Sequence, residues 1–154
     1  MRPTVILLLI VMAGIACKKD AETPTIKVIL ESSKWRLDKL LLESPLGSNP
    51  ADITLTAFKQ CEVDDVIEFK TGGVFSCTEN VDVCPPGSNN SPLYALNGGS
   101  WALSGDTLLT IQKGATSQAF RFSKKTTSVV ELYQQQKNIL DQLVRYTYVI
   151  RAVE

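Results

Sequence analysis

From about residue 35 to the end of the chain, hydrophobic positions recur at every second residue, the spacing that places side chains on one face of a β-strand. The segment LVRYTYVIRA at 143–152 shows this alternation most clearly. Its inward positions are expected to be Val144, Tyr146, Tyr148 and Ile150, and its outward positions Arg145, Thr147 and Arg151. The pattern therefore predicts a strand with one buried face.

Shorter segments repeat this alternation along the chain. They are VIEFK at 66–70, VFSCT at 74–78, SWALS at 100–104, TLLTI at 107–111, AFRFS at 119–123 and SVVELY at 128–133. Connections between them carry turn-forming residues, as in KTGG at 70–73 and SGD at 104–106. Neighbouring strands are therefore predicted to form hairpins.

One more strand is predicted from Trp35 to Leu42, where consecutive leucines break the alternation and indicate a β-bulge. Together these segments make about eight strands in sequence order. Such a series is typical of an antiparallel up-and-down β-barrel, because closure removes the exposed edges of an open sheet. The predicted fold class is all-β, an eight-stranded antiparallel barrel with a short N-terminal helix.

The helix is predicted in TPTIKVILESS at 23–33, in front of the first strand. Thr23 would cap it and Pro24 would occupy its first position, where a missing backbone N–H does no harm. Ile26, Ile29 and Leu30 share one face of this helix, so that face is expected to pack on the barrel.

The chain begins with an apolar run, VILLLIVMAGIA, that ends just before Cys17 and is too short to span a bilayer as a mature helix. The junction GIAC resembles the lipobox of bacterial lipoproteins, and this resemblance implies that Cys17 becomes an acylated N-terminus. Gly14 and Ala16 would also suit an ordinary signal peptidase, and a retained membrane helix is the third alternative. By analogy with other bacterial lipoproteins, Lys18 after the cysteine indicates the outer membrane.

The domain organisation follows from this reading. Residues 1–16 are predicted to be a lipoprotein signal peptide, 17–24 a lipidated tether and 25–154 the barrel. The whole chain has 16 basic and 16 acidic residues, so losing Arg2 with the signal leaves 15 basic against 16 acidic. A nearly neutral chain with scattered basic residues lacks the electrostatic footprint of a nucleic-acid-binding protein.

The three cysteines that follow Cys17 are expected to include a disulfide, because an exported protein folds where thiols oxidise. Strand parity places Cys77 on the same inward face as Phe75, whereas Cys61 and Cys84 lie outside the two strands of this hairpin. A Cys61–Cys84 bridge is therefore predicted, worth about 3 kcal/mol on the chain-entropy model. A metal site of Cys and Asp alone and a reactive Cys77 are the alternatives; no metal is expected, since the chain has no histidine.

Several features together resemble the lipocalin-like domain of bacterial lipoproteins over about residues 28–152. They are a tryptophan opening the first strand, the pattern C-x2-DD-x3-F at 61–69, the second cysteine at 84, GSW at 99–101 and the strand TLLTI. Lipocalins proper carry G-x-W at the first strand, where this chain has Ser33, Lys34 and Trp35. The resemblance implies a barrel able to carry a small ligand.

An aromatic set would either line a ligand cavity or fill the barrel, since eight strands allow both outcomes. Its members are Trp35, Phe69, Phe75, Trp101, Phe120, Phe122, Tyr146 and Tyr148. With aromatics on most strands, a largely filled interior is favoured. No inward position reads as charged, so any ligand inside is expected to be apolar or amphipathic.

Two functions remain after enzymes are set aside. With no histidine, no visible nucleophile with its base and no phosphate loop, the chain is not expected to be an enzyme or to use a cofactor. Asp64 and Asp65 would form a carboxylate site only if the fold assembled it. The first hypothesis is a lipid-anchored barrel that binds a small apolar or amphipathic ligand at its open end, near a long insert at 85–99 and a loop at 134–142. The second is a structural lipoprotein whose solid barrel contacts another envelope protein or a glycan.

Overall fold

The computed structural model describes residues 23–153 and shows an all-β barrel, as predicted. The strands are β1 (Lys34–Glu43), β2 (Ala51–Asp52), β3 (Val66–Lys70), β4 (Val74–Thr78), β5 (Ser100–Ser104), β6 (Leu108–Lys113), β7 (Thr116–Lys125), β8 (Val129–Lys137) and β9 (Leu143–Val153). The helices are α1 (Ile26–Glu31), α2 (Thr54–Ala57), α3 (Gln60–Val63) and α4 (Pro92–Ala95).

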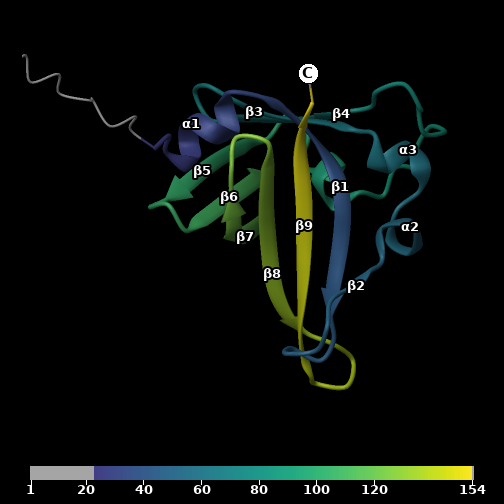
Figure 1. Cartoon of the computed structure of the whole chain (residues 1–154). Coiled ribbons are helices and arrows are strands. Elements are labelled where there is room, and N and C mark those ends of the chain that lie inside the picture. Colours follow the sequence, from purple (N-terminus) through teal and green to yellow (C-terminus); the bar gives the residue numbers. More distant parts are fainter. Residues whose placement is uncertain (1–22, 154) are drawn as a thin grey trace, which may run out of the picture.

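Every strand pairs antiparallel with its neighbour, and the pairing of β1 with β9 closes the sheet into a barrel (Figure 1). Eight strands, β1 and β3 to β9, form this barrel in sequence order, and the two-residue β2 only extends the edge of β1. The predicted number and order of strands are therefore confirmed.

The barrel wall is uneven in length. β1 pairs with β9 from Lys34 to Glu43, but it pairs with β3 only from Lys34 to Arg36. As a result β1, β8 and β9 run well below the short strands β3 to β6 in Figure 1, and α2 and α3 lie beside the gap that this leaves. The lower end of the barrel is thus walled by long strands on one side and by helices on the other.

The predicted bulge in β1 is present, and it lies earlier than the leucines that suggested it. The register against β9 shifts between Leu37 and Lys39, so Asp38 is the extra residue. Because of this shift, the next buried side chain after Trp35 and Leu37 is that of Leu40, three residues further along the strand. The bulge therefore keeps apolar side chains inward along the whole strand.

The pairing of β4 with β5 depends on a glycine. A Cβ atom at Gly99 would lie 2.3 Å from the carbonyl oxygen of Gln112, so no other residue fits there without a shift of the backbone. The Gly99 carbonyl accepts a hydrogen bond from the Phe75 amide at 3.0 Å. The GSW sequence thus lets the chain pass close over β6 at the start of β5.

The predicted helix exists as α1, with a later start. Its cap is Thr25, whose hydroxyl accepts a hydrogen bond from the Val28 amide at 3.4 Å, so the prediction of Thr23 as cap and Pro24 as first helical residue is wrong. Extended backbone at Thr25 continues past the proline, and the helix starts only where a hydroxyl can satisfy a free N–H. Ile26, Ile29 and Leu30 are buried as predicted. No helix within 23–153 is both long and apolar enough to cross a membrane.

Candidate functional site

The end of the barrel near α1 has a packed interior, and two smaller hollows there, of about 260 and 230 Å³, are lined in part by exposed residues such as Lys27, Lys34 and Lys70. We call this end the closed end and define it by five buried side chains: Trp35, Phe69, Phe75, Trp101 and Ile150, each at most 6% exposed. The Phe69 ring lies 5.5 Å from both the Phe75 and the Trp101 rings, and both indole N–H groups donate to backbone carbonyls. Most of the aromatic set thus fills the barrel, since Phe120 is also buried and Phe122 packs against the core.

The opposite end is hollow. A cavity of about 350 Å³ opens there, and we call it the open-end cavity. Its lining residues are Leu40, Ala57, Phe58, Asn90, Pro92, Gln118, Gln134, Gln136, Tyr146 and Tyr148. Of the aromatic set, only Tyr146 and Tyr148 line this cavity. It lies beside the 85–99 segment and the end of β8, where the sequence placed a ligand site.

The inward face of β8 changes chemistry halfway along the strand. Val130 and Leu132 are almost fully buried, whereas the next inward positions, Gln134 and Gln136, are amides that line the cavity. The stretch 134–137 was interpreted as part of a loop, but it belongs to β8 and pairs with β9 as far as Lys137. Polar glutamines at inward positions are therefore what keeps this end of the barrel from being packed with apolar side chains.

Helix α2 forms one lip of the cavity because the start of this helix is fastened to β1 at Leu40. The Thr54 hydroxyl accepts a hydrogen bond from the Leu40 amide at 2.8 Å and donates one to Asp52 at 2.5 Å. The Ile53 amide also donates to the Leu40 carbonyl at 2.9 Å. These bonds satisfy the backbone groups of Leu40 on the edge of β1 where its pairing with β3 has ended, and they hold Phe58 at the mouth.

The segment 85–99 forms the other lip and is tied down by a buried carboxylate. Glu62, only 4% exposed, accepts hydrogen bonds from the Lys59 amide at 2.8 Å and from the Asn90 amide at 2.6 Å. This segment was described from sequence as a long insert, but it contains α4 and buries Leu93 and Leu96. It is therefore an ordered wall of the cavity.

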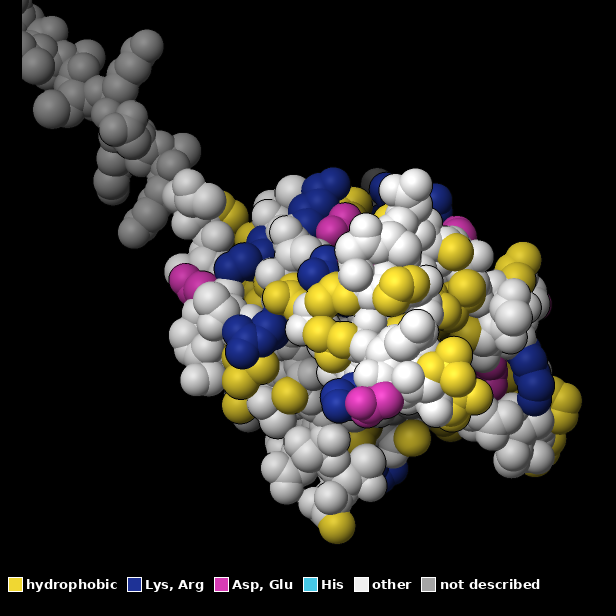
Figure 2. Space-filling model, turned by 90° about the horizontal axis from the view of Figure 1, so that it is seen from below, with side chains coloured by type: hydrophobic (Ala, Val, Ile, Leu, Met, Phe, Trp, Pro, Cys, Tyr) yellow, Lys and Arg dark blue, Asp and Glu magenta, His cyan; other side chains and the backbone are white. Residues whose placement is uncertain are grey.

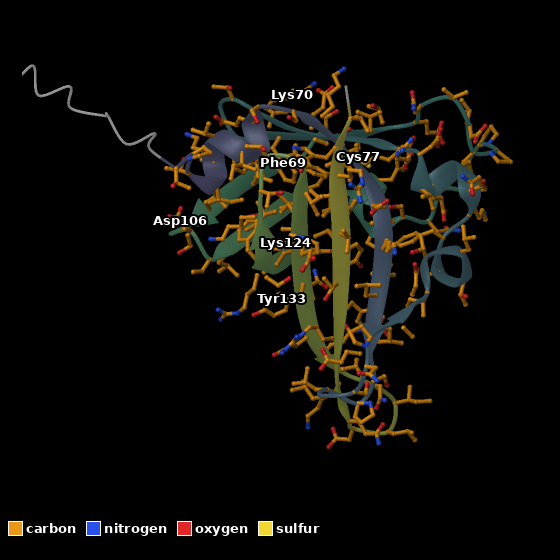
Figure 3. The ribbon with its side chains drawn as sticks, in the orientation of Figure 1. Phe69, Lys70, Cys77, Asp106, Lys124 and Tyr133 are labelled. Atoms are coloured by element: carbon orange, nitrogen blue, oxygen red, sulfur yellow. A yellow bond between two sulfur atoms is a disulfide. The ribbon has the colours of Figure 1, made fainter. Side chains whose placement is uncertain are left out.

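The disulfide joins Cys61 to Cys84, as strand parity predicted, with their Cα atoms 5.2 Å apart. It links α3 to the start of the 85–99 segment and so reinforces the same lip. Cys77 is a free thiol, 1% exposed, and lies with Phe69 toward the closed end (Figure 3). Burial raises the pKa of the Cys77 thiol, and Asp65 raises it further, so a reactive thiolate is disfavoured.

Asp64 and Asp65 are buried, at 9% and 3% exposed, and neither lines the open-end cavity. Asp65 accepts a hydrogen bond from the Asn89 amide group at 3.0 Å, and Asp64 accepts one from the Asp82 backbone at 3.0 Å. Burial raises the pKa of Asp65 to about 6, and the nearby carboxylates of Glu79, Asp64 and Glu62 add to the rise. Within residues 23–153 no group of three or more potential ligands is arranged to hold a metal ion.

The tyrosines are the polar groups deepest in the open-end cavity. Tyr148 is 7% exposed and its ring meets Phe120 edge-on at 5.6 Å. Burial raises the pKa of the Tyr148 hydroxyl, with a smaller contribution from Tyr146. Among the described residues neither hydroxyl has a protein hydrogen-bond partner, so water or a bound molecule must satisfy them.

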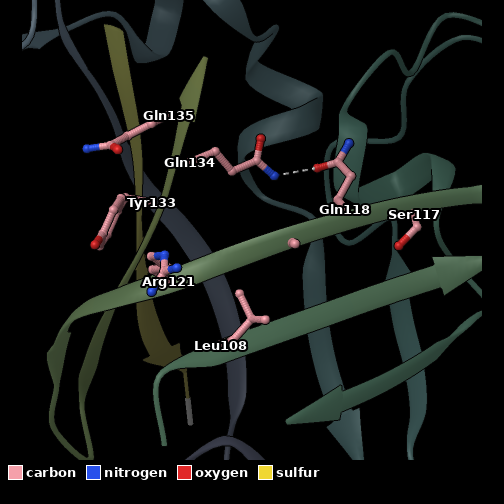
Figure 4. A pocket seen from close by; sticks show the side chains of 8 residues that line it. Leu108, Ser117, Gln118, Arg121, Tyr133, Gln134 and Gln135 are labelled. Atoms are coloured by element: carbon pink, nitrogen blue, oxygen red, sulfur yellow. Dashed lines mark hydrogen bonds between the residues drawn. The ribbon is translucent and has the colours of Figure 1, made fainter. Parts of the chain in front are cut away.

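A second hollow lies on the outside of the wall, and we call it the outer groove. It has a volume of about 490 Å³, and its lining residues are Leu108, Ser117, Gln118, Ala119, Arg121, Tyr133, Gln134 and Gln135. The β7–β8 ladder ends at Arg121 and Tyr133, although both strands continue beyond that pair. In Figure 4 the side chains of Gln118 and Gln134 meet across the resulting split, with 3.3 Å between Nε2 of Gln134 and Oε1 of Gln118.

Seen from below, hydrophobic side chains reach the surface in patches that neutral polar groups interrupt (Figure 2). At this end the turn between β8 and β9 exposes Ile139 completely and Leu140 by 70%. The face therefore offers apolar contact in small areas and carries no broad charged field.

Sequence reasoning missed several residues that form the cavity. They are Leu40, Ala57, Phe58 and Gln118. Gln134 and Gln136 lie within 134–142, the stretch expected near the ligand, and strand parity carried a signal for their inward direction, because they continue the inward series of Val130 and Leu132. No local pattern marks Phe58, whose place depends on the contact of α2 with β1.

Comparison of the chain with protein-family models and with curated proteins finds no match. The fold implied by the lipocalin-like resemblance is confirmed, and membership of that family stays a prediction.

Proposed function

We propose that this protein is a lipid-anchored lipoprotein of the cell envelope whose lipocalin-like barrel binds a small amphipathic molecule. The observation that carries the proposal is the open-end cavity, a hollow of about 350 Å³ in a barrel whose other end is solid. This volume lies near the lower limit of ligand pockets, which run from about 300 to 1,000 Å³. The ligand is therefore small.

The lining of the cavity selects an amphipathic ligand. Leu40, Phe58 and Pro92 supply apolar contact, whereas the glutamine amides and tyrosine hydroxyls supply donors and acceptors. A purely apolar ligand would leave these polar groups without partners, which costs free energy in a partly buried site. No charged side chain lines this cavity, so it would hold the uncharged part of the ligand.

The proposal is for a binding protein and not for an enzyme or a cofactor-dependent protein. The buried carboxylates fasten the 85–99 segment and do not line the cavity, and the chain has no histidine. These features leave no carboxylate or imidazole beside the proposed ligand to act as a general acid or base.

The second candidate is an interaction module, in which the lower end contacts another envelope protein or a glycan. The observation that favours it is the fully exposed Ile139 and the exposed Leu140 at the β8–β9 turn. On this reading the cavity would be a solvent-filled hollow.

Uptake of a fluorescent fatty-acid probe separates the two candidates. We expect the wild type to bind the probe and Ala57→Trp to lose most of the binding, because the indole would fill the mouth beside Phe58. Leu55→Trp is the matched control, since Leu55 lies on the same helix and is 74% exposed. No uptake by the folded wild type, or equal uptake by both variants, would reject the cavity as the site.

The anchor is a separate part of the proposal and concerns Cys17, which lies outside the described residues. Its support is the sequence GIAC after an apolar run, and Lys18 favours the outer membrane. In cells, a fatty-acid analogue should label the wild type, and Cys17→Ala should abolish the label and release the protein from the membrane fraction. A soluble, unlabelled wild type would contradict the anchor.

A further inference from the structure

The split between β7 and β8 lies between the open-end cavity and the outer groove. Gln118 and Gln134 line both hollows, so the two volumes meet at this pair of side chains. β7 from Thr116 to Phe120 is paired only to β6, and β8 from Gln134 to Lys137 only to β9. At this level a side-chain contact, and not a backbone ladder, separates the inside of the barrel from the outside.

That contact is weak enough to part. The bond between the two amides measures 3.3 Å, which is long for a neutral hydrogen bond, and neither amide is fully buried. Both side chains are half-buried, so they keep access to water. A ligand chain can therefore pass between them at the cost of one weak neutral hydrogen bond, because water can satisfy the freed amides.

The chemistry on the far side of the split is cationic. Arg121 projects from the outer face of β7 into the groove, and within residues 23–153 it has no ion-pair partner. Ser117, Tyr133 and Gln135 add uncharged hydrogen-bonding groups. No aspartate or glutamate lines either hollow, so nothing in the lining would repel an anion.

Three other cations of this wall are already engaged. Arg145 pairs with Glu43 at 3.2 Å and lies over the Tyr133 ring at 5.1 Å, and Lys137 pairs with Asp141 at 2.8 Å. Lys125 donates to the Asp106 carbonyl. Arg121 is therefore the cation of the split that remains open to an incoming anionic group.

From this arrangement we infer that the split is the exit for the head group of the ligand, and that the ligand is an anionic amphiphile such as a fatty acid. Its uncharged part lies in the open-end cavity, where retained water keeps hydrogen bonds to the amides and tyrosine hydroxyls. Its chain passes between Gln118 and Gln134, and its carboxylate binds Arg121 in the outer groove. This inference rests on the proposed function, because it assigns the charge of the ligand that the cavity holds.

The test compares a fluorescent fatty-acid probe with its methyl ester, which keeps the chain and removes the charge. We expect the wild type to bind the acid more tightly than the ester. Arg121→Gln should weaken binding of the acid by about fivefold, the effect of an exposed ion pair, and leave the ester unchanged. Raising the salt concentration should weaken the binding of the acid and leave the binding of the ester unchanged.

Two further variants make the result decisive. Gln134→Glu places a negative charge in the split and should weaken the binding of the acid more than the binding of the ester. Lys124→Gln is the matched control, because it removes one positive charge from β7 at a position outside both linings. It should change neither affinity.

The outcomes separate this inference from the proposed function. Equal binding of acid and ester by the wild type, with Arg121→Gln without effect, overturns the anionic exit and leaves the ligand cavity standing. Equal weakening of both probes by Arg121→Gln also overturns it, since the arginine would then act on the fold. Binding of neither probe by the folded wild type overturns both proposals.

Discussion

The end of the barrel under α1 and the end beside α2 and α4 are built from the same long strands but filled differently. At the closed end the inward residues of β8 and β9 are Val130, Leu132 and Ile150, which are at most 1% exposed and belong to the same buried core as the tryptophans. At the other end the same two strands present glutamines and tyrosines to a hollow. One end of the barrel therefore supplies the packed core, and the other end leaves room for a ligand.

The difference has a physical cause that can be followed along the chain. Close packing of aliphatic and aromatic side chains provides most of the stability of a small barrel, so one end must be solid. An amide at an inward position cannot be covered by apolar groups without losing its hydrogen bonds. Each glutamine in the lower half therefore keeps a neighbouring volume accessible to solvent or ligand.

The largest expected effect comes from matched phenylalanine truncations at the two ends. Phe75→Ala should lower the free energy of unfolding by about 3 to 5 kcal/mol, the usual loss for a ring packed on all sides. Phe58→Ala should cost about half as much, because that ring already borders the cavity and has fewer contacts to lose. Chemical denaturation of both variants measures this, and equal losses would remove the distinction between the ends.

The next prediction concerns the disulfide, which reinforces the 85–99 lip of the open end. Replacing both cysteines, Cys61→Ser with Cys84→Ser, should lower stability by about 2 to 4 kcal/mol. Because the bridge fastens the 85–99 wall and not the closed end, amide hydrogen exchange should speed up at residues 85–99 more than in β9. Cys77→Ser is the control for removing a thiol, and uniform acceleration in the double variant would show that the bridge supports the whole barrel.

The smallest of these effects is the pH dependence that Asp65 contributes. Its pKa is about 6 in the folded protein against an ordinary 3.8, so the folded state holds the proton more tightly than the unfolded state. Stability from this group is therefore fully present below about pH 4 and is lost as the pH rises to about 6.

Asp65→Asn should consequently raise the free energy of unfolding by about 1 to 2 kcal/mol at pH 7 and leave it nearly unchanged at pH 4. The amide can still accept the hydrogen bond from Asn89. Asp106→Asn, at an exposed turn, is the control. Equal changes for Asp65→Asn at both pH values would show that the effect does not come from ionisation.

How far the sequence predicts this molecule differs between the two ends. Alternation finds the strands and the inward faces of Phe75 and Cys77, because a strand buried on one side repeats every two residues. The parity of that hairpin also leads to the Cys61–Cys84 bridge. At the closed end, local pattern and tertiary packing agree.

At the open end, local sequence pattern and tertiary packing do not agree. The helices α2 and α4 are only four residues long, too short to show a period, and their positions depend on contacts with β1 and on Glu62. The run of glutamines reads as a loop because amides are rare on inward faces. The split between β7 and β8 leaves no sign in either strand, since it depends on where the ladder ends.

The central claim is that a ligand enters the open end while the closed end stays solid. Magnetic resonance spectra of the protein titrated with the fatty-acid probe test it most directly, since both ends carry resolved side-chain N–H groups. We predict that the amide signals of Gln118 and Gln134 shift on binding, while the indole signals of Trp35 and Trp101, held by hydrogen bonds of 3.0 and 3.1 Å, do not. Shifts at the indoles without shifts at the amides would contradict the account.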